Sequence, residues 1–501
     1  MFSKTYAAAI RGVDALLVQV EADISDGLPG LELVGFLASE LREAKERVRV
    51  AIHNAGIVLP PKKITVNLSP ADVRKEGTAF DLAIAVAILT ASGHLSEEYI
   101  KQTMFVGELS LDGRLNPVNG ILPIACCAKE CGLVQLVVPA KNRAEAMVTG
   151  SLDVWGCETL RQVMELLLGN PPDGIPEEEK KEAAAAGLPD FSEICGQQAA
   201  KRAIEIAVSG GHNLLFLGSP GSGKTMLAKR IPSIMPELTF EESLELSKIY
   251  SVSGKLAAGG TLMKNRPFQA PHHSITVSAM AGGGRNPKPG QISLATHGVL
   301  FLDELPEFER RTIELLRQPL EERKITVNRV AESCDYPAAF MFVAAMNPCP
   351  CGAYPDRKHC RCSEPQIRKY QSKISRAILD RIDLFLQVAP VAYEELQQKG
   401  QGECSAAIRA RVTKTRRIQQ ERYAGLSVRT NAELSAKQLT QFCILPPEGE
   451  ALLKEAFFRY GLSARAYHRI IRVARTIADM EGAEQIGTKH LCEAIGYRRE
   501  V

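Results

Sequence analysis

The sequence predicts an α/β protein in which a parallel sheet covered by helices is preceded by a smaller α+β domain and followed by a helical region. Three observations support this fold class. Apolar strand-like runs alternate with helical stretches in the second part of the chain, which is the pattern of a parallel sheet with helices on its faces. Residues 169–189 are rich in Pro, Gly and Glu and poor in large apolar residues, which is typical of a linker. From about residue 405 the strand-like runs stop.

Individual segments identify the elements. In the first part, "KITVNLSP" and "LVQLVVPA" have the character of strands and "FDLAIAVAILTASG" that of a buried helix. In the second part, "NLLFLG", "GVLFLDE" and "AAFMFVAAMN" predict strands of the parallel sheet. Towards the C-terminus, "SAAIRARVTKTRRIQQERYAG" and "AYHRIIRVARTIADMEG" predict helices.

The composition is that of a soluble protein with several domains. A chain of 501 residues is too long for one hydrophobic core, and 45% hydrophobic and 24% charged residues are ordinary proportions. No run approaches the roughly 20 apolar residues of a membrane span, and the first residues lack a signal peptide's apolar core. We therefore predict a cytoplasmic protein without membrane contact. The net charge of +3 means that nucleic acid would have to meet local basic patches.

The segment "NLLFLGSPGSGKTMLAKRI" contains the pattern G-x-x-x-x-G-K-[ST] between an apolar strand and a helix, the context that identifies a P-loop. Its residues are Gly218, Ser219, Pro220, Gly221, Ser222, Gly223, Lys224 and Thr225. The glycines let backbone N–H groups surround phosphate oxygens. Lys224 places a positive charge on the β- and γ-phosphates, and Thr225 offers a hydroxyl to Mg²⁺. The expected ligands are therefore ATP and Mg²⁺.

Polar side chains follow the next two strands of the predicted sheet. Asp303 and Glu304 end "GVLFLDE", where the carboxyl ends of parallel strands meet. We expect Asp303 to bind Mg²⁺ and Glu304 to act as general base on the attacking water. Alone, this pair is more often a helix cap, and the P-loop reverses that preference. Asn347 could orient the water, although a turn-forming asparagine before Pro348 is the alternative.

These segments resemble the AAA+ ATPases and, within them, the magnesium-chelatase-like group. The stretches "GQQAAKRAIEIAVSGGHNLLFLGSPGSGKTMLAKRIP", "PHHSITVSAMAGGG", "PGQISLATHGVLFLDELPEF" and "ISRAILDRIDL" are similar to the YifB/ComM family, and the similarity covers essentially the whole chain. The resemblance implies a Lon-protease-like α+β domain at 1–168, a linker at 169–189, an AAA+ P-loop core at 190–392 and an α-helical lid at 393–501. It also implies that Gly196 and Gln197 contact the adenine.

The resemblance also assigns two arginines. Arg381, in "LDRIDL", matches the arginine finger that reaches the γ-phosphate of a neighbouring subunit, and Arg465, in "LSARAYHRIIR", matches the sensor-2 arginine of the lid. An intrachain salt bridge from Arg381 to Asp380 or Asp383 is the alternative, and Arg376 is a rival finger. A finger that acts on a neighbour implies a homo-oligomeric ring, which we expect to be a hexamer.

The first domain resembles the Lon protease domain and its relatives, including the C-terminal domain of the recombination factor RadA, through "GELSLDGRLNPVNGILPIACCA". In "KEGTAFDL" the place of the catalytic serine is taken by Ala79, and in "NGILPI" the place of the catalytic lysine is taken by Ile124. Because nucleophile and base are both missing, we predict an inactive protease fold that serves as a ring-forming scaffold.

Two segments could line the pore of such a ring. The stretch "LEERKITVNRVAESCDYPAAFMF" predicts a hairpin before the strand that ends at Asn347. The resemblance implies that this hairpin touches DNA through Lys324 and Arg329, and an ordinary surface hairpin is the alternative. The segment "RPFQAPHHSITVSAMAGGG" resembles a second pore element, the helix-2 insertion. Its adjacent His272 and His273 point in different directions, which argues against a shared metal.

The C-terminal region is locally basic, which suits phosphate contacts, although a solvated helix face is the alternative. The basic residues between 405 and 431 are Arg409, Arg411, Lys414, Arg416, Arg417, Arg422 and Arg429.

The stretch "NPCPCGAYPDRKHCRC" holds two Cys-x-Cys pairs, formed by Cys349, Cys351, Cys360 and Cys362. In a reducing compartment cysteines are thiols or metal ligands, and four of them favour a structural Zn²⁺ site, in which His359 could replace one ligand. Unligated thiols and a redox switch are the alternatives.

Together these features predict a ring-forming ATPase that moves along DNA, of the helicase or branch-migration type, in the uptake and recombination of transforming DNA. Its expected partners are single-stranded or branched DNA and further copies of the chain. The alternative is a magnesium-chelatase-like ATPase that remodels a partner protein.

Overall fold

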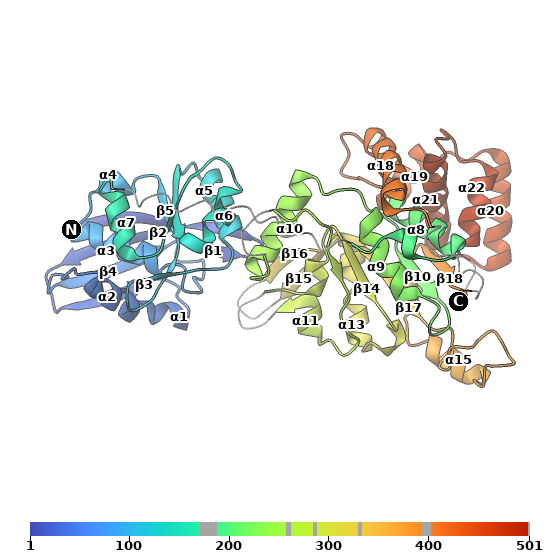
Figure 1. Cartoon of the computed structure of the whole chain (residues 1–501), viewed down its shortest axis with the longest axis horizontal. Coiled ribbons are helices and arrows are strands. Elements are labelled where there is room, and N and C mark those ends of the chain that lie inside the picture. The colour runs from blue at the N-terminus through green and yellow to red at the C-terminus, as the bar shows by residue number, and fades with distance from the viewer. Residues whose placement is uncertain (171–187, 257–261, 284–287, 329–332, 392–401, 499–501) are drawn as a thin grey trace.

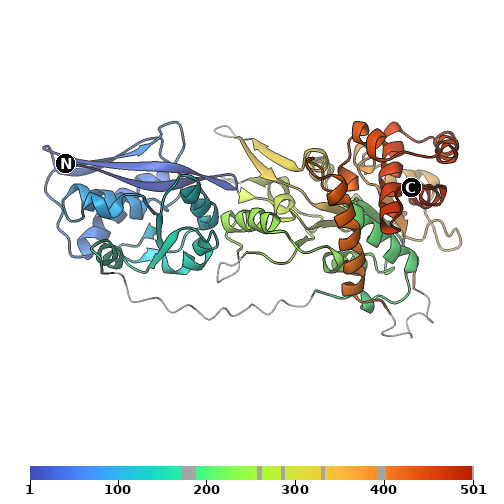
Figure 2. The ribbon, with the colours of Figure 1, turned by 90° about the horizontal axis from the view of Figure 1, so that it is seen from above.

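The computed structural model describes residues 1–170, 188–256, 262–283, 288–328, 333–391 and 402–498 (Figure 1). Most of the linker predicted at 169–189 lies outside these ranges. The N-terminal domain lies at one end of an elongated molecule, the central region that contains the P-loop in the middle, and the C-terminal helices at the other end (Figures 1 and 2). Within the described ranges, no helix combines the length and apolar character needed to cross a membrane.

The N-terminal domain is built on a seven-stranded sheet in the order β3-β4-β2-β1-β5-β8-β9. The strands are β1 (Phe2–Arg11), β2 (Asp14–Ser25), β3 (Gly30–Val34), β4 (Lys63–Ser69), β5 (Thr103–Phe105), β8 (Gln135–Pro139) and β9 (Asp153–Cys157), with a small hairpin of β6 (Glu108–Leu109) and β7 (Leu115–Asn116). The helices are α1 (Ser39–Arg42), α2 (Ala44–Asn54), α3 (Asp81–Ala91), α4 (Glu97–Ile100), α5 (Ile121–Glu130), α6 (Arg143–Met147) and α7 (Leu160–Leu167). The two predicted strands are β4 and β8, and the predicted buried helix is α3, whose residues are all buried.

The central region contains a five-stranded sheet in the order β11-β14-β17-β10-β18, in which every pair is parallel. Its strands are β10 (Leu214–Leu217), β11 (Phe268–Gln269), β14 (Val299–Leu302), β17 (Met341–Met346) and β18 (Leu384–Gln387). The helices of this region are α8 (Gln198–Gly210), α9 (Lys224–Ile234), α10 (Phe240–Val252), α11 (Val277–Ala281), α12 (Gln291–Leu294), α13 (Arg310–Glu314), α14 (Arg317–Glu322), α15 (Glu364–Gln371) and α16 (Arg376–Leu379). The three strands predicted from apolar runs are β10, β14 and β17, so the predicted α/β fold class with a parallel sheet is confirmed.

The predicted hairpin is formed by β15 (Lys324–Asn328) and β16 (Ser333–Pro337), which pair in antiparallel fashion. Its second strand is therefore "SCDYP", a segment that the sequence analysis did not single out, and the following apolar run belongs to the central sheet as β17. A second small hairpin is formed by β12 (Gly282–Gly283) and β13 (Lys288–Pro289).

The C-terminal region is helical throughout its described residues. Its helices are α18 (Ser405–Arg422), α19 (Ala436–Phe442), α20 (Pro447–Tyr460), α21 (Ala464–Met480) and α22 (Thr488–Gly496). The apolar face of α21 packs with α8 and α18 in one core that also includes the central sheet. This shared core holds the helical region against the central region.

The N-terminal domain and the central region meet at α10. The ammonium group of Lys248 lies 2.9 Å from the carboxylate of Asp14, and the Ser251 hydroxyl donates to the buried carboxylate of Glu145 at 2.5 Å. Val13, at the tip of the β1–β2 hairpin, packs into the core of the central region beside β15 and β16. Polar bonds and an apolar contact thus join the two regions.

A buried ion pair holds α2 against α3. The guanidinium of Arg47 donates to both carboxylate oxygens of Asp81, at 2.9 and 3.1 Å, and the backbone N–H of Leu109 donates to the same carboxylate. Asp81 is fully buried, and this burial raises the pKa of its carboxyl group to about 6 although Arg47 opposes the shift.

Replacement of Arg47 by Met should destabilise the N-terminal domain by about 3–5 kcal/mol, because the Asp81 carboxylate would stay buried without a cationic partner. Adding Asp81→Asn should recover most of this loss, since the amide oxygen can still accept from Leu109. Trp155 is the only tryptophan, so its fluorescence during urea unfolding reports on this domain. Arg49→Met, on the exposed side of α2, is the control and should change stability by less than about 0.5 kcal/mol. Equal unfolding midpoints for Arg47→Met and Arg49→Met would contradict a stabilising role of the Arg47–Asp81 ion pair.

Candidate functional site

The P-loop connects β10, the strand between β17 and the edge strand β18, to the first turn of α9. Gly221 and Gly223 have left-handed backbone angles, with φ of 78° and 90°, which favour glycine. Gly218 lies so close to β18 that a Cβ atom there would be 2.5 Å from the carbonyl oxygen of Val388. The glycines of the motif are thus required by the turn itself and by its packing on the neighbouring strand.

Lys224 places its ammonium group inside the loop. Its Nζ donates to the carbonyl oxygens of Gly218 and Ser219, at 2.7 and 2.9 Å, and to the side-chain oxygen of Asn347 at 3.2 Å. Burial lowers the pKa of Lys224, while Asp303 and Glu304 oppose the shift. The amide of Asn347 at the end of β17 therefore meets the P-loop lysine at the end of β10.

Thr225 and Asp303 offer two oxygen ligands at the same edge of the sheet. The Thr225 hydroxyl donates to a carboxylate oxygen of Asp303 at 2.5 Å, and both groups are accessible to solvent. Hydroxyl and carboxylate oxygens are the ligands that Mg²⁺ takes beside phosphate groups. The two side chains fit the predicted metal site.

Glu304 follows directly and remains accessible, with 58% of its side chain exposed. Its backbone is left-handed, with φ of 51°, and its N–H donates to the Asp303 carboxylate at 3.0 Å. The Nδ1 atom of His273 lies 4.0 Å from the Glu304 carboxylate. From the sequence, a metal shared by His272 and His273 was not expected, and no contact of His273 with Glu304 was predicted. The contact between His273 and Glu304 depends on tertiary packing, and their separation in the sequence could not predict it.

Gly196 and Gln197 precede α8 with left-handed backbone angles, φ of 59° and 55°. The side chain of Gln197 donates to the carbonyl oxygen of Ala389 at 2.6 Å, just beyond the end of β18. Because Val388 touches Gly218, the predicted adenine-contacting pair lies at the same end of the sheet as the P-loop.

Arg381 and Arg465 lie elsewhere, in a pocket of about 470 Å³. None of the described residues that line this pocket belongs to the P-loop. Arg465 is largely exposed, with Nη1 4.0 Å from the carboxylate of Asp380. The structure therefore brings the two arginines together and does not bring either of them to the phosphate loop of its own chain.

Arg381 is held by intrachain bonds. Its guanidinium forms an ion pair with Glu321 on α14 and donates to the Ala377 carbonyl oxygen at 2.5 Å. Burial lowers the pKa of Arg381. The expected alternative was a salt bridge to Asp380 or Asp383, and the partner is instead Glu321. Asp383 pairs with Arg469 from α21.

The rival finger has a different environment. Arg376 begins α16 and its side chain is exposed. Within the described parts of the chain its guanidinium group makes no hydrogen bond or ion pair, so it can meet another molecule.

Ala79 and Ile124 pack in one apolar cluster of the N-terminal domain, together with Ile121 on the same helix as Ile124. The two positions expected to carry the protease nucleophile and its base therefore belong to one apolar cluster, and they hold a methyl group and a branched alkyl chain.

Of the two residues expected to contact DNA, the structure describes Lys324. The ammonium group of Lys324 lies 2.8 Å from the carboxylate of Asp335 on the opposite strand of the hairpin, which offsets its charge. Arg329 lies outside the described residues. In α18, Arg411 pairs with Glu205 and Glu403.

Other basic residues of α18 also turn inward. Arg416 donates to the Val208 carbonyl oxygen at 2.8 Å, and Arg422 pairs with Asp479 at 2.5 Å. Burial lowers the pKa of Arg416 to about 10. Arg416 thus joins α18 to α8, and Arg422 joins α18 to α21 within the helical region. Of the basic residues suggested as a phosphate-binding patch, Lys414 and Arg417 stay exposed.

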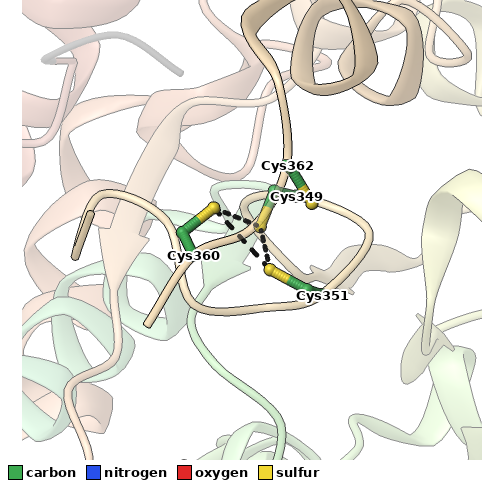
Figure 3. Close-up of side chains that lie close together, drawn as sticks. All are labelled: Cys349, Cys351, Cys360 and Cys362. Carbon is green, nitrogen blue, oxygen red and sulfur yellow. Dashed lines mark hydrogen bonds between the residues drawn. The ribbon is translucent and has the colours of Figure 1, made fainter. Parts of the chain in front are cut away.

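The four cysteines of the loop after β17 come together (Figure 3). Their sulfur atoms all lie within 4.8 Å of one another. His359 is directed elsewhere, with Nδ1 2.6 Å from a carboxylate oxygen of Asp356. The cluster is therefore a set of four thiols without a histidine.

A parallel sheet with a P-loop after β10, and with carboxylates and an amide at the same edge, defines a P-loop ATPase of the AAA+ class. Three family profiles match the chain. They are described as magnesium chelatase, subunit ChlI, over residues 190–396, as subunit ChlI of Mg-chelatase over 20–142, and as magnesium chelatase, subunit ChlI C-terminal, over 402–498.

The chain belongs to the magnesium-chelatase-like family that includes ComM and YifB, as the sequence resemblance predicted. It is 45% identical over 502 residues to competence protein ComM of Haemophilus influenzae, which covers 99% of this chain and 97% of that protein. It is 42% identical over 502 residues to the uncharacterized protein YifB of Escherichia coli, with the same coverage of 99% and 97%. A shorter similarity, 25% over 158 residues, relates 29% of the chain to 20% of the Lon protease of Mycolicibacterium smegmatis.

Two substitutions should separate nucleotide binding from hydrolysis. Lys224→Ala should abolish ATP binding, because the ammonium group that meets the phosphates is lost. Glu304→Gln should preserve ATP binding and lower kcat by about 10²- to 10⁴-fold, since the amide cannot accept a proton from water. Binding of a fluorescent ATP analogue and phosphate release measure the two effects.

Glu307→Gln is the matched control for this pair of measurements. Its carboxylate is exposed and pairs with Lys373, so its loss should leave both binding and turnover unchanged. Full ATP turnover in the Lys224→Ala variant would contradict the P-loop assignment.

Proposed function

We propose that this chain is a ring-forming, ATP-driven DNA motor of the helicase or branch-migration type that acts in the uptake and recombination of DNA. The observation that carries the proposal is the separation, on one chain, of two groups of residues that would together form the two halves of an ATP site. The P-loop with its carboxylates lies at one edge of the sheet, and the pocket of Arg381 and Arg465 lies apart from it. Each half is complete only when another copy of the chain supplies the other half.

The residues at the sheet edge divide the work of hydrolysis. Mg²⁺ bound at the phosphates would neutralise their charge in the transition state. Thr225 and Asp303 would hold that ion, and Lys224 would bind the β- and γ-phosphates. Glu304 would accept the proton of the attacking water, which the amide of Asn347 would orient against the γ-phosphate.

A ring brings the two halves together. In a homo-oligomer, expected to be a hexamer, Arg381 would reach the γ-phosphate bound to the neighbour and Arg465 would support it from the same pocket. The intrachain bond of Arg381 to Glu321 would then have to open or shift on assembly. Residues 1–168, which lack the protease nucleophile and base, would act as a scaffold for the ring.

The DNA-related part of the proposal has two supports. One is the similarity over 99% of this chain to a protein named for competence. The other is the β15–β16 hairpin, which directly follows α14, the helix that holds Arg381 through Glu321. Movement of this hairpin on a DNA strand would be transmitted to the finger, and the expected place of action is the cytoplasm.

A second function is a protein-remodelling ATPase of the magnesium-chelatase type. It is favoured by the three profiles named for the ChlI subunit, which together match most of the chain. Under this alternative the ring would hydrolyse ATP in response to a partner protein and would be indifferent to DNA.

The ATPase rate with and without single-stranded DNA distinguishes the two functions. We expect stimulation of several-fold by single-stranded DNA and ATP-dependent unwinding of forked or four-way substrates. Glu304→Gln should bind DNA and unwind nothing, which controls for passive strand separation. A chain that neither binds DNA nor responds to it would exclude the DNA motor and leave the remodelling ATPase.

Mixed rings test whether the finger acts on a neighbour. Arg381→Ala and Glu304→Gln should each lose hydrolysis while retaining ATP binding. Mixed in equal amounts, they should recover part of the wild-type ATPase rate, because some interfaces then combine an intact finger with an intact Glu304. Arg376→Ala is measured in parallel, alone and mixed with Glu304→Gln. Only the variant of the true finger should be inactive alone and recover activity on mixing. No recovery in either mixture, with co-assembly shown by cross-linking, would exclude a finger that acts between subunits.

A further inference from the structure

The four cysteines of the loop between β17 and α15 have the geometry of ligands around one ion. The sulfur of Cys349 lies 3.4 Å from that of Cys351 and 3.8 Å from that of Cys360, and the sulfurs of Cys351 and Cys360 are 3.7 Å apart. The sulfur of Cys362 completes the group from the side of α15, and all four lie within 4.8 Å of one another (Figure 3).

These separations match a single tetrahedral metal. Zn–S bonds of about 2.3 Å place tetrahedral ligands about 3.8 Å apart. A disulfide would bring two sulfurs to about 2.05 Å, and all four cysteines are free thiols. The ligands of an iron–sulfur cluster bind different iron atoms and are therefore spread more widely than ligands of one ion. A mononuclear site with four thiolates favours zinc.

The loop that carries the site is built against the P-loop. Gly352 directly follows Cys351 and has a left-handed backbone, with φ of 80°. A Cβ atom at this position would lie 2.3 Å from Cδ and 2.9 Å from Cγ of Pro220. Only a glycine lets the loop backbone come this close to the P-loop.

A second contact joins the same loop to the nucleotide site. Asn347 lies two residues before Cys349, and its side-chain oxygen accepts from Nζ of Lys224 at 3.2 Å. The loop therefore touches the phosphate-binding turn at two points, the Asn347–Lys224 hydrogen bond and the Gly352–Pro220 contact. The thiols of the first Cys-x-Cys pair lie between these points along the chain.

We propose that Cys349, Cys351, Cys360 and Cys362 hold one Zn²⁺ ion, and that the metal-loaded loop fixes the P-loop in its nucleotide-binding form. Four protein ligands leave no open position, so the ion is structural and takes no part in hydrolysis. The ion ties the segment after Asn347 to the segment before α15. The effect on nucleotide rests on the proposed role of the P-loop, whereas the metal site does not.

Metal content tests the site itself. The purified full-length protein should contain about one zinc per chain. After exchange with Co²⁺ it should show the visible absorption bands of tetrahedral, thiolate-bound cobalt. Cys351→Ser/Cys360→Ser should lose both signals. Cys404→Ser/Cys492→Ser replaces two exposed cysteines outside the cluster and should retain both. Absence of stoichiometric zinc and of cobalt bands in the wild-type protein, or iron in place of zinc, would overturn the proposal.

A measurement on the wild-type chain covers the case in which the cysteine variant fails to fold. Zinc released by a thiol-blocking mercurial should appear at one ion per chain in a metal indicator assay. The same treatment of Cys404→Ser/Cys492→Ser should release the same amount. Release of no zinc from either protein would overturn the proposal.

Nucleotide affinity tests the coupling. Gly352→Ala should keep its zinc and bind a fluorescent ATP analogue about tenfold more weakly, as expected if the binding form of the P-loop falls to about one tenth of the population. Gly425→Ala is the matched control, since Gly425 also has a left-handed backbone, with φ of 82°, and open space around its Cβ position. Unchanged affinity in Gly352→Ala would overturn the coupling.

Neither readout involves DNA, so the outcomes separate the two proposals. Zinc with a lowered nucleotide affinity in Gly352→Ala supports the coupling even if DNA does not stimulate the ATPase. DNA stimulation together with an absence of metal would retain the motor and remove the zinc site.

Discussion

The parallel pairing of β10 with β17 on one side and with β18 on the other is the constraint on which the site depends. Parallel strands end at the same edge of a sheet, so residues far apart in sequence meet there. The P-loop follows β10, Asn347 follows β17, and the segment that contacts Gly218 and Gln197 follows β18. The Lys224–Asn347 hydrogen bond is the direct result, because it joins the ends of two neighbouring strands.

Several arginines of the C-terminal helical region bond to other parts of the same chain. Arg411, Arg416 and Arg422 look like a phosphate-binding stripe when their charges are counted along α18. In the fold, Arg411 and Arg416 bond to α8 of the central region, and Arg422 pairs with Asp479 on α21 within the helical region. A guanidinium group that is already bonded within its own chain holds two elements together. It is therefore less available to bind a phosphate group than an unpaired arginine at the surface.

Much of the fold and the ATP site could be predicted, because the signals are local. A strand, a glycine-rich turn and a helix are encoded in one run of residues, and so are the carboxylates that end β14. The second strand of the β15–β16 hairpin was missed, since "SCDYP" has little β-propensity and is held by its partner strand. The partner of Arg381 was also missed, because Glu321 lies sixty positions away in the sequence.

The sequence by itself determined the chemistry that is available: a phosphate-binding turn, two carboxylates, an amide, four thiols, and apolar side chains in place of a protease nucleophile and base. Only the tertiary structure decided which of these groups meet. It placed His273 beside Glu304, grouped Arg381 with Arg465 away from the P-loop, and set Gly352 against Pro220. The physical reason is that periodicity and spacing report on neighbours within one element, whereas contacts between elements are set by sheet order and packing.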